Sequence, residues 1–314
     1  MINKKAFLAL VIGICMICGL AACSKDQAEA PEESSPEENS SAEAGVAVSV
    51  NTVTTDSFEV DYLQFGNGDK NMVILPGLSV QSVMGSAEAV AQAYSQFADE
   101  YTVYLFEHKK DLPETYTVKD MAKDMAEVFR ANGLEDIYLF GASLGGMTSI
   151  EIAIQNPDLI SKVVLGSTTA CLTDEQYDRS IGAWKELAKQ KDAEKLYLAF
   201  GEQVYPEEVF EQSRDALIAA AATVTDEELA RFIILAEGIK GFDVTDEIGS
   251  IKCPVLALGA SDDKVVGGDA TEKIAELLKD HPDCESYVYE AGYGHAAYDT
   301  APDYKDRIQE FFSK

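Results

Sequence analysis

The hexapeptide Gly-Ala-Ser-Leu-Gly-Gly at residues 141–146 constrains the fold of this chain more than any other segment. An apolar, strand-like run at residues 137–140 precedes it, and a helix-like run at residues 147–155 follows it. A sharp turn from a strand into a helix leaves no room for side chains on its flanks, which explains the glycines. Such a turn lifts the hydroxyl of Ser143 clear of the sheet, so the pattern predicts a nucleophilic serine there.

Apolar runs alternate with segments of helical spacing on both sides of this turn. Strands are predicted at residues 46–54, 58–65, 72–75, 102–106, 137–140, 162–166, 254–258 and 286–290. Segments with helical periodicity lie between and after them, at residues 86–101, 118–132, 147–155, 271–280 and 303–312. This alternation is typical of an α/β fold, so the sequence predicts a mostly parallel central sheet flanked by helices.

The alternation stops between about residue 170 and residue 245. This stretch contains no convincing strand and four segments of helical spacing, at residues 175–190, 193–201, 206–222 and 226–238. Because the strand pattern resumes afterwards, we expect an inserted helical lid. Most of its large apolar residues should form the core of the lid, and two or three should line a hydrophobic pocket: Trp184, Leu187, Leu196, Leu198, Phe200, Phe210 and Phe232.

A serine hydroxyl is a weak nucleophile at neutral pH and needs a base to accept its proton. The chain has three histidines, of which His295 lies in a glycine-rich loop directly after the last predicted strand. Open α/β sheets place their ligands at the carboxyl ends of the strands, so His295 is the predicted base. His281 precedes a strand and is expected in solvent. His108 is expected in a loop among charged residues, with contact to substrate as the alternative.

A third group must hold the base, and a carboxylate after another strand end would do so. Asp262 and Asp263 both follow residues 254–258, and either could accept a hydrogen bond from His295 Nδ1. Asp263 is favoured, because the lysine, two valines and glycine after it match a variable residue, two apolar residues and a turn. Asp262 is then expected to fix the loop or to face solvent.

Ser143, Asp263 and His295 occur in the chain order of the α/β-hydrolase family, which residues 46–314 resemble. Two further segments agree with this family: Asn-Pro-Asp-Leu-Ile at residues 156–160 and Ile-Lys-Cys-Pro-Val at residues 251–255. The resemblance implies a helical lid after Gly166. It also implies hydrolysis of an ester or related acyl bond through an acyl-enzyme intermediate.

Hydrolysis by this route requires backbone N–H groups that bind the developing oxyanion. The resemblance places one on Leu144, directly after the serine, and a second on Leu78, after Pro76 and Gly77. Family members commonly carry His-Gly at residues 76–77, so Pro76 is a departure that removes a side chain which often supports the loop. Because the donors are backbone groups, catalysis need not suffer.

The first 23 residues have the features of an export signal. Lys4 and Lys5 precede an apolar run at residues 6–20, which is too short and too rich in glycine and cysteine for a membrane-spanning helix. The tetrapeptide Leu-Ala-Ala-Cys that ends at Cys23 resembles the lipobox of bacterial lipoproteins, which implies cleavage before Cys23 and lipid attachment to its sulfur. We therefore expect an extracytoplasmic protein that a lipid anchors to the bacterial cell membrane.

The segment after the signal, residues 24–45, is rich in alanine, glutamate, serine and proline and contains no aromatic residue. A disordered acidic tether is expected there, with one large domain at residues 46–314. The formal net charge of −30 argues against nucleic acid as a partner. Three cysteines remain outside the signal, and free thiols are favoured over a bridge between Cys253 and Cys284.

These features predict a membrane-anchored serine hydrolase that acts on a small-molecule acyl substrate without a cofactor. No cluster of histidines and cysteines suggests a metal site, and nothing indicates an oligomeric state. Two alternatives remain. The same fold and triad would serve carbon–carbon bond hydrolysis or cofactor-free haloperoxidase chemistry. A surface lipoprotein would instead use the cleft to bind a ligand without catalysis, although such a module gains nothing from a complete triad.

Overall fold

The computed structural model describes residues 46–314. The predicted signal at residues 1–23, its lipidation site Cys23 and the predicted tether at residues 24–45 lie outside the described residues. Within the described part, no helix is long and apolar enough to span a membrane.

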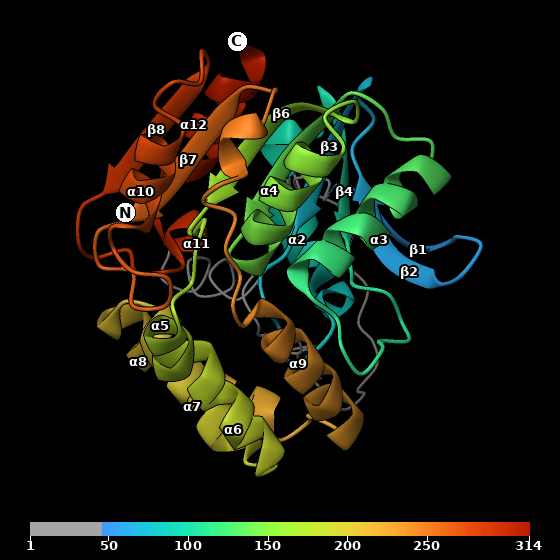
Figure 1. The fold of residues 1–314 in the computed structure, drawn as a ribbon. Helices are drawn as coiled ribbons and strands as arrows, with labels where there is room; N and C mark the ends of the chain where they lie inside the picture. The colour runs from blue at the N-terminus through green and yellow to red at the C-terminus, as the bar shows by residue number, and fades with distance from the viewer. Residues whose placement is uncertain (1–45) are drawn as a thin grey trace, which may run out of the picture.

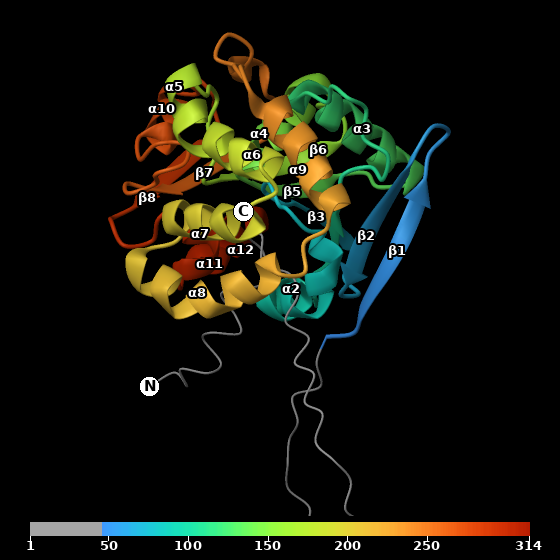
Figure 2. The same ribbon diagram turned by 90° about the horizontal axis from the view of Figure 1, so that it is seen from below.

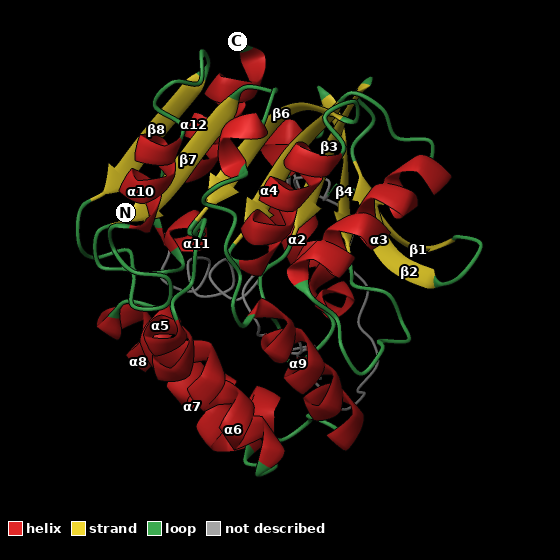
Figure 3. Ribbon diagram, viewed as in Figure 1, coloured by secondary structure: helices red, strands yellow, loops and turns green. Residues whose placement is uncertain are grey.

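An eight-stranded sheet forms the centre of the described domain (Figure 1, Figure 3). The strands are β1 Val48–Thr54, β2 Glu59–Phe65, β3 Lys70–Leu75, β4 Tyr101–Phe106, β5 Ile137–Ala142, β6 Ile160–Gly166, β7 Val255–Ala260 and β8 Cys284–Tyr289. Their order in the sheet is β1-β2-β4-β3-β5-β6-β7-β8. The pairs β1–β2 and β2–β4 are antiparallel, and all later neighbours are parallel. The predicted α/β class with a mostly parallel sheet is confirmed.

Helices cover both faces of this sheet. They are α2 Ala87–Ala93, α3 Val118–Ala131, α4 Leu144–Gln155, α10 Ala270–Leu277, α11 Ala297–Thr300 and α12 Tyr304–Ser313. Figure 2 shows α3, α4 and α10 on one face and α2 and α12 on the other. Because both faces are covered, every residue of β7 is buried, which explains its uninterrupted apolar sequence.

A second group of helices is inserted between β6 and β7 and lies beyond the carboxyl ends of the parallel strands (Figure 1). It consists of α5 Asp174–Tyr177, the π-helical turn η3 Asp178–Gly182, α6 Ala183–Lys189, α7 Ala193–Val204, α8 Glu207–Ala221 and α9 Asp226–Ile239. Thr173 and Thr225 begin α5 and α9, each with a capping box. We call this group the lid.

Two predicted helices differ from the structure. The segment 86–101 does not form one helix, because α2 ends at Ala93, a 3-10 turn follows, and Tyr101 opens β4 opposite Lys70. The buried aromatic residues of this segment are spaced as in a helix, which led to the prediction. In the structure Tyr101 pairs with β3 and belongs to the sheet instead. The segment 175–190 is divided into α5 and α6 by η3.

The three cysteines in the described residues are free. Cys284 pairs in register with Val255, so Cys253 lies two residues away from the position opposite it. This offset explains why the adjacent strands do not bring the two sulfur atoms into a bridge.

Candidate active site

Ser143 occupies the turn between β5 and α4 in a conformation that few residues adopt. Its φ is 55° and its ψ is −118°, and a non-glycine residue in such a region costs about 1–3 kcal/mol. The neighbouring glycines are required by space, because a Cβ on Gly141 would overlap the carbonyl of Gly145, and a Cβ on Gly145 would overlap the carbonyl of Leu75. The turn therefore presents the serine side chain beyond the end of the sheet.

Contacts with the neighbouring strand hold this strained residue in place. The N–H of Ser143 donates to the carbonyl of Gly166 at 2.9 Å, and Thr168 Oγ1 donates to the carbonyl of Ser143 at 2.8 Å. Both contacts come from the end of β6, so the sheet itself fixes the serine backbone.

His295 and Asp263 meet in a buried position after the carboxyl ends of β8 and β7. His295 Nδ1 lies 2.8 Å from Asp263 Oδ2, and the two side chains are 3% and 2% exposed. Asp263 Oδ1 accepts hydrogen bonds from the N–H groups of Val265 and Val266 at 2.8 and 3.0 Å. Because a carboxylate only accepts, Nδ1 carries the proton and Nε2 is left as the acceptor.

The adjacent aspartate, Asp262, forms hydrogen bonds with the backbone of the loop and not with the imidazole. Asp262 Oδ2 accepts from the N–H of Gly292 at 2.7 Å, and its Oδ1 accepts from the N–H of Gly294 at 3.0 Å. Both glycines have positive φ values, 116° and 62°, which a side chain would strain. Asp262 therefore fixes the loop that carries His295, whereas the structure brings Asp263 to the imidazole itself.

The loop after β3 passes directly beside the serine. A Cβ on Gly77 would lie 3.3 Å from Ser143 Cβ and 3.8 Å from its Oγ, so this loop contacts the serine side chain closely. Leu78 and Leu144 line the same cavity as Ser143 and His295. Four of the five site residues predicted in this domain therefore line one cavity. The fifth, Asp263, contacts His295 from outside the cavity.

The cavity over Ser143 is small, largely enclosed and mostly apolar. Its volume is about 10 Å³, which is room for roughly one water molecule. Trp184 and Phe200 are the members of the predicted lid set that line it, together with Ile181 and Ile239 from η3 and α9. The other large apolar residues of that set do not line this cavity.

Hydrogen bonds connect the lid to the loops around the cavity. Tyr197 of α7 donates through its hydroxyl to Gln81 Oε1 at 2.9 Å, in the loop after β3. The carbonyl of Val204, at the end of α7, accepts from the N–H of Ala296 at 3.0 Å, next to His295. Ser180 of η3 donates to the carbonyl of Val265 at 3.4 Å. The lid therefore contacts three of the loops that carry the candidate site residues.

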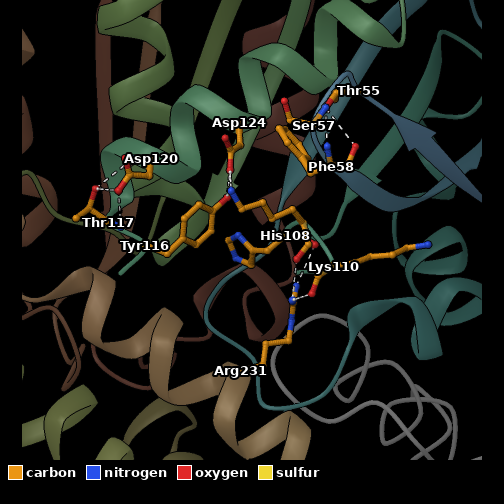
Figure 4. A network of polar contacts seen from close by, with 11 residues as sticks. Thr55, Ser57, Phe58, His108, Lys110, Tyr116, Thr117, Asp120, Asp124 and Arg231 are labelled. Atoms are coloured by element: carbon orange, nitrogen blue, oxygen red, sulfur yellow. Dashed lines mark hydrogen bonds and ion pairs between the residues drawn. The ribbon is translucent and has the colours of Figure 1, made fainter. Parts of the chain in front are cut away.

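A partly buried polar network joins α9 to the loop after β4 (Figure 4). Arg231 of α9 donates to the carbonyls of His108, Lys109 and Lys110 at 3.0, 2.8 and 3.2 Å. Lys109 Nζ in turn lies 2.8 Å from Asp124 Oδ2. The network attaches the last helix of the lid to the loop after β4 and, through Lys109, to α3.

Glu107 extends this network toward the loop after β3. Its side chain is buried, its Oε2 accepts from the N–H of Val83 at 3.1 Å, and its Oε1 lies 3.7 Å from Arg231 Nη2. His108 lies in a loop, as expected, but it is buried there, and both its ring nitrogens lack a hydrogen-bond partner. The sequence carried no signal for this burial, because charged residues surround His108 in the chain.

No group of three or more histidine, cysteine, aspartate or glutamate side chains in residues 46–314 has an arrangement that could hold a metal ion.

Comparison with known proteins agrees with this architecture. The family model described as alpha/beta hydrolase fold matches residues 91–302. The chain is therefore a hydrolase of the α/β-hydrolase family. In solved structures it resembles MGS-M2, an alpha/beta hydrolase enzyme from a deep-sea metagenome library, with a TM-score of 0.74 and 19% identity over 84% of this chain and 98% of that one.

Curated relatives share slightly more sequence with the chain but cover less of it. RutD of Rhizobium rhizogenes, whose name gives carbamate hydrolysis as its expected activity, is 23% identical over 67% of this chain and 80% of its own length. Serine hydrolase BPHL of Mus musculus is 26% identical over 49% of this chain and 56% of its own length.

The buried imidazole makes the fold sensitive to acid. Burial lowers the pKa of His108 from 6.5 to about 4, while Glu107 and Asp124 act to raise it and Arg231 to lower it. Between these two pH values the unfolded chain binds a proton that the folded chain does not, so stability is lost as the pH falls from about 6.5 toward 4. In His108→Leu, the loss of unfolding free energy between pH 7 and pH 4.5 should shrink by about 1–3 kcal/mol in urea titrations.

His281→Gln is the matched control for this experiment, because His281 lies in the loop before β8, away from the network. It should keep the wild-type acid dependence. An unchanged acid dependence in His108→Leu would contradict the assignment of this sensitivity to the buried imidazole.

Proposed function

We propose that this protein is a serine hydrolase that cleaves an ester or a related acyl bond. The observation that carries the proposal is the buried hydrogen bond between His295 Nδ1 and Asp263 Oδ2, on an imidazole that lines the same cavity as Ser143. Burying a carboxylate is costly unless it is paired, and here the pair directs the acceptor nitrogen of the imidazole away from the carboxylate. This arrangement suits a base that removes a proton from a neighbouring hydroxyl.

In the proposed reaction, Ser143 Oγ attacks the acyl carbon while His295 Nε2 accepts the hydroxyl proton. Asp263 keeps the ring oriented and stabilises the imidazolium that forms. The imidazolium then gives its proton to the leaving group, and the acyl group remains on Ser143 as an ester. Water, activated by the same imidazole, hydrolyses this acyl-enzyme and restores the serine.

The negative charge that develops on the acyl oxygen requires donors close to Ser143. Leu144 is the first residue of α4, where backbone N–H groups have no partner within the helix. Gly77 lets the loop after β3 approach the serine, and Leu78 after it lines the same cavity. We assign the two N–H groups of Leu78 and Leu144 to the oxyanion site.

The relatives widen the range of bonds that deserve testing. A carbamate, the substrate class in the name of RutD, contains an acyl carbon that a serine attacks in the same way as an ester. The name of BPHL refers to a serine hydrolase, in agreement with the proposed nucleophile.

A pair of aspartate variants tests the proposed roles, with hydrolysis of p-nitrophenyl acetate as the assay. Asp263→Asn should lower kcat by about 10³–10⁴-fold, because it favours the wrong tautomer of His295. Asp262→Asn keeps a carbonyl oxygen that can accept from one glycine N–H of the loop, so its kcat should stay within about tenfold of the wild type. Equal losses in both variants, or a larger loss in Asp262→Asn, would refute the assigned acid.

We also propose that the mature protein is anchored outside the cytoplasm by a lipid on Cys23. The support is the lipobox-like Leu-Ala-Ala-Cys sequence at the end of the predicted signal. Expressed in a bacterium, the wild type should partition into the membrane fraction and carry a diacylglyceryl group in mass spectra, and Cys23→Ala should lose both properties. A wild-type protein whose mature N-terminus lies elsewhere would rule out this anchor.

A further inference from the structure

Two aromatic side chains of the lid occupy the space above Ser143. Trp184 of α6 and Phe200 of α7 lie with ring centroids 4.3 Å apart, and they are 2% and 4% exposed. Both line the cavity of about 10 Å³ that also contains Ser143. An acyl chain of more than a few carbons would have to displace one of these rings.

The rest of the cavity wall indicates the polarity of the group that fits. Met147, Ile181, Ile239 and Val265 contribute aliphatic surface, and His295 is the only ionisable side chain among its lining residues apart from the phenol of Tyr298. An ammonium group in this space would be buried without a partner of opposite charge, which is costly, and a carboxylate would pair with the imidazolium and so remove the base that the proposed reaction needs. The wall therefore suits an uncharged, apolar acyl group.

Polar contacts attach α6 and α7, the helices that carry Trp184 and Phe200, to neighbouring elements. Lys185, next to Trp184, forms an ion pair with Glu237 of α9. Tyr197, three residues before Phe200, donates to Gln81 in the loop after β3 at 2.9 Å. Because both helices are attached to neighbouring elements, the two rings form a fixed wall rather than a loose cover.

The indole of Trp184 contributes bulk rather than polarity to this wall. Its Nε1–H is buried and has no hydrogen-bond partner. A phenylalanine at this position would lose no hydrogen bond, so any change that it causes reflects the smaller ring.

We propose that Trp184 and Phe200 determine specificity by restricting the substrate to short, uncharged acyl groups. This inference rests on the serine hydrolase function proposed above, because the rings are assigned to the acyl side of the nucleophile. The restriction acts through volume: each ring fills the space that the distal carbons of a longer acyl chain would need.

The test uses p-nitrophenyl acetate, butyrate and octanoate with the full-length protein. Wild-type kcat/KM should fall at least about tenfold from butyrate to octanoate, since misfit of even one methylene is worth about tenfold or more in a close-fitting pocket. Trp184→Ala and Phe200→Ala should each raise the octanoate-to-acetate ratio of kcat/KM by at least about tenfold. A general loss of stability would lower all three rates and leave this ratio unchanged.

Two further variants serve as controls. Trp184→Phe removes only part of the ring, so its ratio should lie between those of the wild type and Trp184→Ala. Leu198→Ala removes an apolar side chain from the same helix as Phe200, but Leu198 lines a separate hollow and not the cavity over Ser143, so this variant should retain the ratio.

Labelling of Ser143 by a compact fluorophosphonate tests the serine hydrolase function separately from the restriction on acyl length. A wild type that is labelled but prefers octanoate would overturn the restriction and leave the serine hydrolase function standing. The same holds if Trp184→Ala and Phe200→Ala are labelled yet keep the wild-type ratio. A wild type that is neither labelled nor active on any ester would overturn both. If Trp184→Ala does not fold, Phe200→Ala decides.

Discussion

Close backbone packing at the end of β5 determines where the candidate catalytic groups meet. The backbone of Gly145 lies so near the carbonyl of Leu75 that a single methyl group would overlap it. This contact brings the start of α4 against the end of β3 and holds Ser143 at a φ of 55°. The strain of about 1–3 kcal/mol is stored where it serves the site, because it places the serine hydroxyl at the carboxyl edge of the sheet.

The other groups reach this point from separate elements that the lid holds together. His295 and Asp263 come from the loops after β8 and β7, and the lid contacts both loops through hydrogen bonds from its own helices. The same lid supplies the rings of Trp184 and Phe200 above the serine. The geometry of the site and the proposed restriction on the substrate therefore depend on one set of contacts. A change in lid packing is expected to affect both.

Local patterns were sufficient to predict the α/β class and the inserted lid, and they supplied the hypothesis for the residues around the site. The glycines that flank Ser143 and the aspartates after β7 carry this information in the sequence itself. The residues after Asp263 favoured it over Asp262, but the different partners of the two aspartates are visible only in the structure. The burial of His108 and the place of Tyr101 were also missed, since both depend on contacts with residues far away in the chain.

An acyl group trapped on Ser143 would test the central claim most directly. The full-length protein would be mixed with p-nitrophenyl acetate, quenched in acid within milliseconds and digested for mass spectrometry. The account predicts a burst of p-nitrophenol close to one equivalent per active site and an acetyl group on the peptide that contains Ser143. Steady release of p-nitrophenol without a burst, with the acetyl group absent or attached to another residue, would contradict it.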